Sequence, residues 1–414
     1  MKKIRILGFM VINVYELRGS EGDGIVKIKV LQFISSIHTG GAETLVKEYA
    51  QKIDKEKFHI EVLCFNRLDS PYEKLLQESN ITVTFLSDHR FFIDKVHPNL
   101  FERAFNKILR YILVRQYIRK MKPDIIHFHL NIASYVNFAS PKEKAVIFYT
   151  HHSAPQRLLS DRWYRGTVEN IKSLIKKYRV HILALHDEMK NELQDIFKFN
   201  NISVLNNGVD GDRFRINLNK SQAKQRLGFA ETDVVIGHVG RFVQLKNHVF
   251  LLKVFRQVKN KVPAAKLLLV GSGELKNKIL REAKLLGIDE DIKILENRLD
   301  IPEIMKAMDC FVFPSISEGL GIVTIEAQFA GCPVVTSEAV DKRTAISNLI
   351  QYVSLDRSES DWANTILDCI TDCDEKKIQY YGLESWDMKY VIKKLEKLYE
   401  DEYATMHVGA KERN

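Results

Sequence analysis

Two glutamates flank a glycine-containing turn in the stretch SISEGLGIVTIEAQFAGCPVV (315–335), with Glu318 before the glycines and Glu326 eight positions later. An apolar helical pattern begins at this turn, so backbone N–H groups from Gly319 to Gly321 can hold phosphate oxygens at a helix start. The two carboxylates need not touch each other, and each can accept hydrogen bonds from a pair of hydroxyls. The stretch therefore indicates a ligand that combines a phosphate with sugar or ribose hydroxyls.

Two cations lie in a second loop, GRFVQLKNH (240–248), which places Arg241 and Lys246 five residues apart beside a glycine. Two cations on a loop between a strand and a helix suit a diphosphate. A third loop, SSIHTGGAET (35–44), has glycines that let the backbone approach a ligand, and a helix beginning near Ala42 would point N–H groups at an anion. Each loop alone could be a solvated surface segment.

Short apolar runs of strand length alternate with amphipathic stretches of helix length, and this alternation would position the three loops. A first series of seven runs extends from IKVLQFI (28–34) to ISVLNNG (202–208), and a second series of five begins at VVIGHVG (234–240). The pattern indicates parallel sheets with helices on both faces. We predict an α/β fold with two doubly wound parallel-sheet domains facing each other across a cleft, where such sheets bind ligands.

The length of 414 residues agrees with two domains. We divide the chain into a leader of unassigned role (1–25), a first domain (26–205), a second domain (206–385) and a final helical segment (386–414). The leader begins with basic and apolar residues, but Asn13 and Glu16 interrupt the apolar run, so we do not expect a secretory signal. No uninterrupted apolar stretch approaches the ~20 residues that cross a bilayer.

The net charge of +9 is uneven along the chain. Residues 1–200 hold 32 Lys and Arg against 22 Asp and Glu, whereas residues 201–414 hold 30 against 31. The densest basic segment, 101–122, has seven basic residues, one acidic residue and apolar residues at helical spacing. Such a helix could lie on an anionic membrane surface, or it could be the solvated face of a packed helix. We expect no nucleic-acid partner.

Metal-binding patterns in the sequence are weak. The five cysteines are scattered, which is typical of buried thiols in a reducing compartment, and Cys369 and Cys373 lack the second pair of a zinc site. The D-x-D strings at 210–212 and 289–291 match those of metal-dependent transferases, but we expect no metal, because cations of the chain can serve its role. His127 and His129 alternate along DIIHFHL, and we expect them on opposite faces of a sheet.

Six motifs in order carry a family resemblance: GGAE, THHS, NNGVD, GRFVQLK, VGSGEL and the E-x7-E pattern of FPSISEGLGIVTIEAQFAGCPVV. With them the chain, from about Val26 to Tyr403, resembles the retaining glycosyltransferase family 4. Its members have two Rossmann-like domains in the GT-B arrangement. The ending NLIQYVSLDRSESDWA further resembles bacterial transferases that build exopolysaccharide or capsule repeat units. One departure is EAVDKRTAI after CPVVTS, where many members have a Gly-Gly loop, which affects the acceptor side.

The resemblance implies a role for each motif residue. Glu326 would bind the ribose hydroxyls of a nucleotide sugar, and Glu318 would bind hydroxyls of the transferred sugar. Arg241 and Lys246 would neutralise the diphosphate. In THHS, His152 would contact the donor's sugar and its leaving phosphate.

Further residues have supporting roles under the same resemblance. Backbone N–H groups of Gly41, Leu320 and Gly321 would assist the cations at the diphosphate, and Arg298 would lie near the base. His151 is the reserve candidate for the role of His152. The second domain would then bind the nucleotide sugar, the first would bind the acceptor, and the C-terminal helix would cross back to the first domain.

The implied activity is a metal-independent, retaining transfer of a hexose-type sugar, with a UDP-sugar as the favoured donor and a glycan or lipid-linked acceptor. Attack would occur on the face that the leaving phosphate vacates, and that phosphate would help to deprotonate the acceptor. The expected location is the cytoplasm, with the inner face of the plasma membrane as an open alternative. A nucleotide-sugar epimerase and a non-catalytic sugar-nucleotide-binding partner also stay open. A glycosidase is disfavoured, because hydrolysis has no use for the two cations.

Overall fold

The computed structural model describes residues 27–38, 40–95 and 97–408, so the predicted leader lies outside the described residues. Seven parallel strands form the first sheet, in the order β3-β2-β1-β4-β5-β6-β7. Their bounds are β1 (Ile28–Ile34), β2 (Phe58–Cys64), β3 (Thr82–Phe85), β4 (Ile125–His129), β5 (Val146–Thr150), β6 (Arg179–Ala184) and β7 (Ile202–Val204).

Six parallel strands form the second sheet, in the order β10-β9-β8-β11-β12-β13. Their bounds are β8 (Val234–Val239), β9 (Ala265–Val270), β10 (Ile292–Leu295), β11 (Cys310–Phe313), β12 (Val334–Ser337) and β13 (Ile350–Val353). The sequence analysis missed β13, because this edge strand is short and only its first residue is buried.

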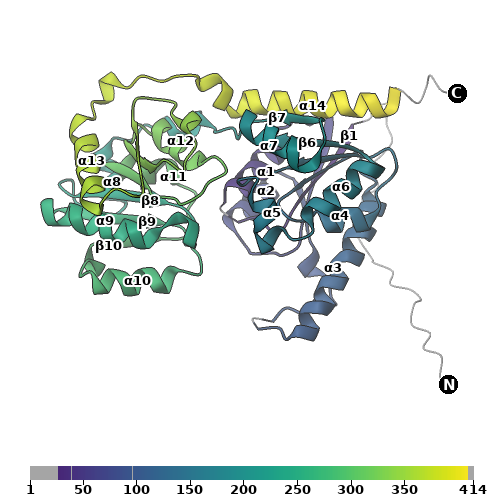
Figure 1. Cartoon of the computed structure of the whole chain (residues 1–414), viewed down its shortest axis with the longest axis horizontal. Coiled ribbons are helices and arrows are strands. Elements are labelled where there is room, and N and C mark those ends of the chain that lie inside the picture. The colour runs from purple at the N-terminus through teal and green to yellow at the C-terminus, as the bar shows by residue number, and fades with distance from the viewer. Residues whose placement is uncertain (1–26, 39, 96, 409–414) are drawn as a thin grey trace.

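Helices cover both sheets (Figure 1). In the first domain they are α1 (Gly41–Lys52), α2 (Pro71–Glu78), α3 (Leu100–Met121), α4 (Ala133–Ala139), α5 (Arg157–Ser160), α6 (Thr167–Lys177) and α7 (Asp187–Phe197). Those that follow are α8 (Lys220–Arg226), α9 (His248–Lys261), α10 (Lys276–Leu285), α11 (Ile301–Ala307), α12 (Ile322–Phe329), α13 (Glu359–Asp372) and α14 (Met388–Val408). The predicted class, two Rossmann-like parallel-sheet domains, is confirmed.

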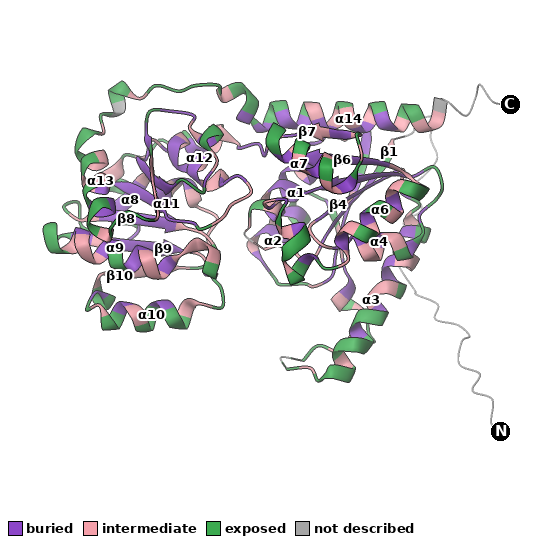
Figure 2. Ribbon diagram, viewed as in Figure 1, coloured by how far each residue is buried: buried purple, intermediate pink, exposed green. Residues whose placement is uncertain are grey.

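The central strands are buried on both faces, as Figure 2 shows for the two sheets. Every residue of β4 (IIHFH) and β5 (VIFYT) is buried, so neither strand has a solvated face. Side chains that cap the N-terminus are present at the start of several helices, among them α2, α8 and α13. The longest, α3, begins with a capping box in which Asn99 and Glu102 bond to each other's backbone N–H groups.

The strand order changes direction at β1 in the first sheet and at β8 in the second, since β1 lies between β2 and β4 and β8 lies between β9 and β11. At such switch points the loops at the carboxyl ends of neighbouring strands turn in opposite directions and leave a crevice for a ligand. The loops that the sequence singled out follow β1, β8 and β11. They therefore belong to the two switch points.

The C-terminal helix α14 lies along the first domain (Figure 1). Met388, Val391, Leu395 and Tyr399 are buried in the same apolar cluster as residues of β1, β2 and β5. Polar contacts add to this packing: Glu396 accepts a hydrogen bond of 2.7 Å from the backbone N–H of Asp54. The end of the chain therefore completes the core of the first domain.

None of the helices in the described ranges is long and apolar enough to span a bilayer. The amino-terminal part of α3 projects from the body of the first domain (Figure 1).

Candidate active site

Lys246 and Glu318 meet between two neighbouring strand ends of the second sheet. Lys246 ends the short helical turn after β8, and Glu318 lies in the loop after β11. The ammonium nitrogen of Lys246 is 2.6 Å from the Oε1 atom of Glu318 and 4.5 Å from the centre of the Phe313 ring. Both side chains are largely buried, so their charges interact in an environment that screens them less than water does.

Ser315 supports this pair, and the sequence analysis did not single it out. Its hydroxyl lies within hydrogen-bond distance of the Glu318 carboxylate and 2.8 Å from the carbonyl oxygen of Leu245. The backbone N–H of Ile316 donates to the same carbonyl at 2.8 Å. The loop of Glu318 is thus tied to the loop of Lys246. The available signal was the position of Ser315 directly after a buried strand, two residues past its end.

Gly319 brings the second domain against the first. A Cβ atom at this position would lie 2.5 Å from the carbonyl oxygen of His152 and 3.2 Å from the Cα atom of Ser153. Real Cβ atoms do not approach a backbone so closely, so only glycine allows this contact. The loop that carries Glu318 therefore touches the end of β5, where the predicted residue His152 lies.

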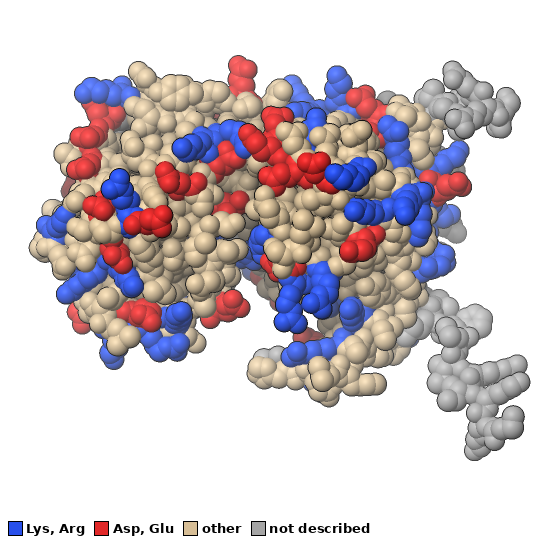
Figure 3. Space-filling view, viewed as in Figure 1, with Lys and Arg blue, Asp and Glu red and all other residues tan. Residues whose placement is uncertain are grey.

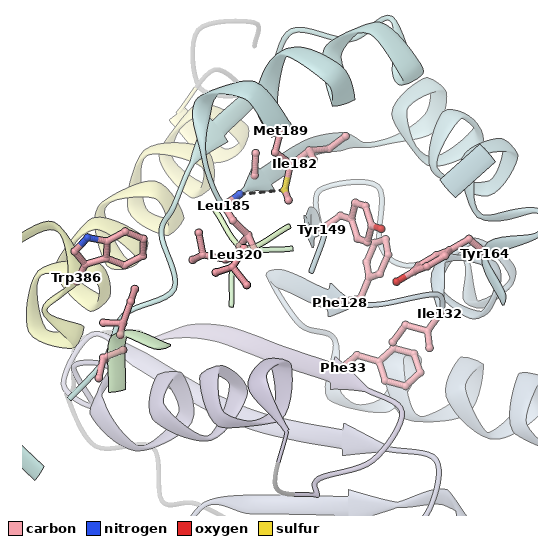
Figure 4. Packing of buried hydrophobic residues seen from close by; sticks show 14 of the residues in the cluster. Phe33, Phe128, Ile132, Tyr149, Tyr164, Ile182, Leu185, Met189, Leu320 and Trp386 are labelled. Atoms are coloured by element: carbon pink, nitrogen blue, oxygen red, sulfur yellow. Dashed lines mark hydrogen bonds between the residues drawn. The ribbon is translucent and has the colours of Figure 1, made fainter. Parts of the chain in front are cut away.

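Buried apolar residues cross the same boundary. Leu320, which follows Gly319, belongs to one cluster with Leu185 and Met189 of the first domain (Figure 4). The next residue, Gly321, has a φ of +85°, a left-handed conformation that favours glycine, and it is the N-cap residue of α12. No side chain caps α12, and none caps α1, which begins after Gly40. Both helix starts therefore retain backbone N–H groups for an anion.

His152 has one nitrogen with a partner and one without. Its Nε2 atom lies 2.9 Å from Nδ1 of His129, whereas its Nδ1 atom is buried and has no hydrogen-bond partner. Burial, together with the neighbouring His151, lowers the pKa of His152 to about 3, so the ring is neutral near pH 7.

His151, the reserve candidate, is engaged on both sides. Its Nδ1 atom is 2.9 Å from the Tyr149 hydroxyl, and its Nε2 atom is 3.3 Å from the Ser153 hydroxyl. Of the two histidines in THHS, His152 is therefore the one with an unpartnered ring nitrogen.

The expectation that His127 and His129 point to opposite faces is wrong. Their ring centres are 4.3 Å apart, and both side chains are fully buried. Side chains alternate from one residue to the next along a strand, so residues two apart share a face. Both histidines contact Gln32 on the adjacent strand β1.

Glu326 lies on α12 and carries a perturbed carboxyl group. Burial raises the pKa of Glu326 to about 7, although the positive charges of Arg213 and Lys47 oppose this rise. Lys47, on α1 of the first domain, is itself buried and pairs with Glu48 at 2.6 Å. The structure thus places Glu326 within electrostatic range of a lysine from the opposite domain, which local sequence patterns did not indicate.

Arg241 and Arg298 differ in how they are held. The Arg241 side chain is exposed, and in the part of the chain that the structure describes it has no ion-pair partner. Its loop is nevertheless fixed, because the N–H of Phe242 donates to the carbonyl of Ser272 at 2.8 Å. Arg298 makes two hydrogen bonds to the carboxylate of Asp300, one of them with an Nε–Oδ1 distance of 2.7 Å. A nucleotide base bound here would therefore share the Arg298 guanidinium group with Asp300.

A pocket of about 300 Å³ lies between the domains. The first domain contributes Ala154, Pro155, Gln156, His186, Met189 and Glu192, and the second contributes Glu318, Gly319 and Glu338 to Lys342. The segment 338–342 belongs to the loop EAVDKRTAI. In this loop, Oδ2 of Asp341 lies 3.7 Å from Nε2 of His186 in the first domain. The loop therefore helps to line the cleft.

Three of the four aspartates in the D-x-D strings contact lysines. Asp210 pairs with Lys52 at 2.6 Å, and Asp212 pairs with Lys389 at 2.9 Å. Asp291 lies 2.7 Å from Lys266. Over the ranges that the structure describes, no group of three or more His, Cys, Asp or Glu side chains could hold a metal ion.

Two family models match the chain, one for each domain. Residues 39–213 match the model described as Glycosyltransferase Family 4, and residues 219–382 match the model described as Glycosyl transferases group 1.

Relatives match over most of the length. The putative glycosyltransferase EpsF of Bacillus subtilis (strain 168) is 28% identical over 348 residues, which cover 82% of this chain and 86% of EpsF. An Escherichia coli protein named UDP-Gal:alpha-D-GlcNAc-diphosphoundecaprenol alpha-1,3-galactosyltransferase is 24% identical over 84% of this chain and 88% of its own. The crystal structure of Anabaena HepE with UDP and glucose has a TM-score of 0.67 at 19% identity, covering 93% of this chain and 98% of HepE.

Proposed function

Because the chain belongs to glycosyltransferase family 4 and has the GT-B fold, we propose that it is a retaining, metal-independent hexosyltransferase in bacterial cell-surface polysaccharide synthesis. The proposed donor is a UDP-sugar and the proposed acceptor is a glycan or a lipid-linked sugar. The names of two relatives support this choice, since one transfers galactose from UDP-Gal to a diphosphoundecaprenol-linked sugar and the other holds UDP and glucose.

The observation that carries the proposal is the Lys246–Glu318 pair, whose loop contacts the backbone of His152 in the first domain through Gly319. A cation and a carboxylate at this interdomain contact match a ligand with an anionic end and a hydroxyl-rich end. An epimerase would need an acid and a base for proton transfer, and His152 and Glu318 could supply them, so acceptor dependence has to separate the two activities.

In the proposed reaction the bond between the anomeric carbon and the diphosphate oxygen breaks, and a bond to the acceptor hydroxyl oxygen forms on the same face. The acceptor proton passes to the leaving phosphate. Negative charge grows on the diphosphate, and one cation at ~4 Å stabilises such an anion by ~4 kcal/mol at an effective dielectric near 20. Arg241, Lys246 and the start of α12 would therefore lower the barrier to bond breaking.

The purified full-length chain should be tested against UDP-glucose, UDP-galactose, UDP-N-acetylglucosamine and GDP-mannose, with and without diphosphoundecaprenol-linked N-acetylglucosamine. We expect one UDP-sugar to release UDP only when acceptor is present, to yield a product with the donor's anomeric configuration, and to react equally well in EDTA. Conversion of the donor without acceptor would instead support an epimerase. Binding without turnover of any donor would support a non-catalytic role.

We also propose that the protein is cytoplasmic and contacts the anionic inner face of the membrane through α3. Phe101, Phe105, Ile108 and Ile112 follow one another at helical spacing and are exposed, Phe101 by 77% and Ile108 by 62%. Exposed basic residues, among them Arg103 and Lys107, interleave with them, and Figure 3 shows Lys and Arg side chains gathered around this part of the first domain. This combination favours binding at an anionic lipid surface.

A further inference from the structure

His152 is the end of a buried chain of hydrogen bonds that starts on the C-terminal helix. Tyr399 of α14 lies 3.0 Å from Nε2 of Gln32 on β1, and Oε1 of Gln32 lies 2.8 Å from Nε2 of His129. Nδ1 of His129 then lies 2.9 Å from Nε2 of His152. This series of hydrogen bonds therefore runs from α14 through β1 and β4 to His152, where the two domains are in contact.

The same tyrosine holds a second histidine. Its hydroxyl lies 2.6 Å from Nδ1 of His127, and Nε2 of His127 lies 2.7 Å from the hydroxyl of Thr150. Tyr399, Gln32, His127 and His129 are buried. Burial lowers the pKa of His127 and of His129 well below the ordinary value, and neighbouring imidazoles lower it further, so each ring is neutral with one donor and one acceptor nitrogen.

The orientation of the Gln32 amide in the structure gives the direction of the hydrogen bonds between Tyr399 and His152. Its amide nitrogen donates to the Tyr399 oxygen, so its amide oxygen faces His129 and must accept from Nε2–H of that ring. The Nδ1 atom of His129 is then an acceptor, and it accepts from Nε2–H of His152. Since His152 is neutral, its buried and unpartnered Nδ1 atom carries a lone pair.

We propose that Tyr399, Gln32 and His129 are positioning residues that hold His152 in its Nε2–H tautomer, so that Nδ1 accepts a hydrogen bond from a hydroxyl of the donor sugar. The tautomer follows from the orientation of the Gln32 amide in the structure, whereas the identity of the ligand rests on the proposed glycosyltransferase function. A phosphate oxygen without a proton cannot donate to this lone pair. Nδ1 of His152 therefore serves the sugar and not the leaving phosphate.

The tautomer can be read directly in the full-length protein, without a ligand. Long-range proton–nitrogen NMR spectra of protein labelled with 15N in the histidine rings distinguish protonated from unprotonated ring nitrogens, and a His152→Gln variant assigns the signals. We expect His152 to be protonated at Nε2 and unprotonated at Nδ1. A proton on Nδ1 of His152 overturns the proposal, whether or not the protein is a glycosyltransferase.

Variants test the hydrogen-bond relay, which consists of Tyr399, Gln32, His129 and His152. Tyr399→Phe removes the hydroxyl that orients Gln32, and Gln32→Met removes the acceptor of His129. Each should give a mixture of the two His152 tautomers. Tyr117→Phe removes a half-buried hydroxyl of the first domain that contacts Glu61 and lies outside these hydrogen bonds, so it should leave the His152 signals unchanged. Unchanged His152 signals in both relay variants would contradict the proposal.

Binding measurements separate the relay from general stability. Calorimetric titrations with UDP, UDP-glucose and UDP-galactose should show that Tyr399→Phe and Gln32→Met bind UDP as the parent does but bind the preferred UDP-sugar about tenfold more weakly, the effect of one lost hydrogen bond. Equal losses for UDP and UDP-sugar would indicate a merely structural role and overturn the proposal. Absence of UDP-sugar binding by the parent chain would refute the proposed function, while the NMR result would still decide the tautomer.

Discussion

Lys246 is the cation that the structure ties most firmly to the predicted site. Its ammonium group is fixed between Glu318 and the Phe313 ring, so it needs little reorganisation when a diphosphate arrives. A pre-positioned charge in a partly buried site stabilises developing negative charge more than a mobile surface charge does. Lys246 should therefore act mainly on the step that breaks the bond to the leaving group.

Replacing Lys246 by alanine should lower kcat by about 100-fold or more, because the barrier loses a cation close to the leaving diphosphate. UDP release from the preferred UDP-sugar, with acceptor present, measures the effect. Lys253→Ala is the matched control, since Lys253 is an exposed lysine on the helix that follows Lys246. Parent-like turnover by Lys246→Ala would refute the diphosphate assignment.

The Glu326 carboxyl should make stability depend on pH. Its pKa is raised from 4.5 to about 7 by burial, so between these values the folded chain holds a proton that the unfolded chain has lost. The free energy of unfolding should therefore fall as pH rises from about 4.5 to 7, by about 3 kcal/mol at most.

Urea unfolding at pH 5 and pH 8 checks this prediction. Glu326→Gln has no carboxyl to ionise and should lose less stability than the parent over this interval. Equal losses in both proteins would show that Glu326 ionises normally in the folded chain.

At the scale of elements, α3 combines two faces with different tasks. Leu109, Leu113, Val114 and Ile118 are buried and anchor the helix to the first domain. The opposite face exposes the apolar residues from Phe101 to Ile112, with basic residues between them. An exposed apolar face of this kind on a projecting helix indicates an interaction site.

Membrane binding by α3 can be tested with a double variant, Phe101→Ser together with Ile108→Ser. The parent should sediment with vesicles that contain phosphatidylglycerol and stay in solution with pure phosphatidylcholine, because both apolar burial and charge attraction are needed. The double variant should lose most of the binding. Leu285→Ser, which alters a leucine exposed by 80% on α10 of the second domain, should bind like the parent. Equal binding to both kinds of vesicle, or unchanged binding by the double variant, would exclude this role for α3.

At the scale of the whole molecule, the two domains meet through few elements near the site. The loop of Glu318 touches the end of β5, and α14 returns from the second domain to pack on the first. Gly319 is the residue that permits the first of these contacts.

Gly319→Ala should keep the two domains slightly apart, because its methyl group would overlap the His152 carbonyl. We expect at least a tenfold loss of turnover, since reacting groups on the two domains would be misplaced. Small-angle X-ray scattering should show a larger radius of gyration, with the helix content unchanged by circular dichroism. Ile316→Ala, which trims an exposed side chain of the same loop, should change neither quantity. Parent-like activity and dimensions in Gly319→Ala would show that this contact is dispensable.

Patterns in the sequence were enough to predict the α/β fold with two parallel-sheet domains and the family, and both predictions are confirmed. These are local properties, because strand runs, helix periodicity and glycine loops are written within a few neighbouring residues. The roles of Arg241, Lys246, Glu318 and Glu326 stay predictions. The short strand β13 was missed because its residues do not form a distinctive apolar run.

Contacts between residues far apart in the sequence could not be predicted and depend on how the chain folds. Gln32 and Tyr399 are 367 positions apart and bond to each other only because α14 packs on the first sheet. The placement of Lys47 near Glu326, and of Gly319 against His152, likewise depends on how the domains face each other. Such contacts leave no periodic trace in a single sequence, since each partner satisfies only the local rules of its own helix or loop.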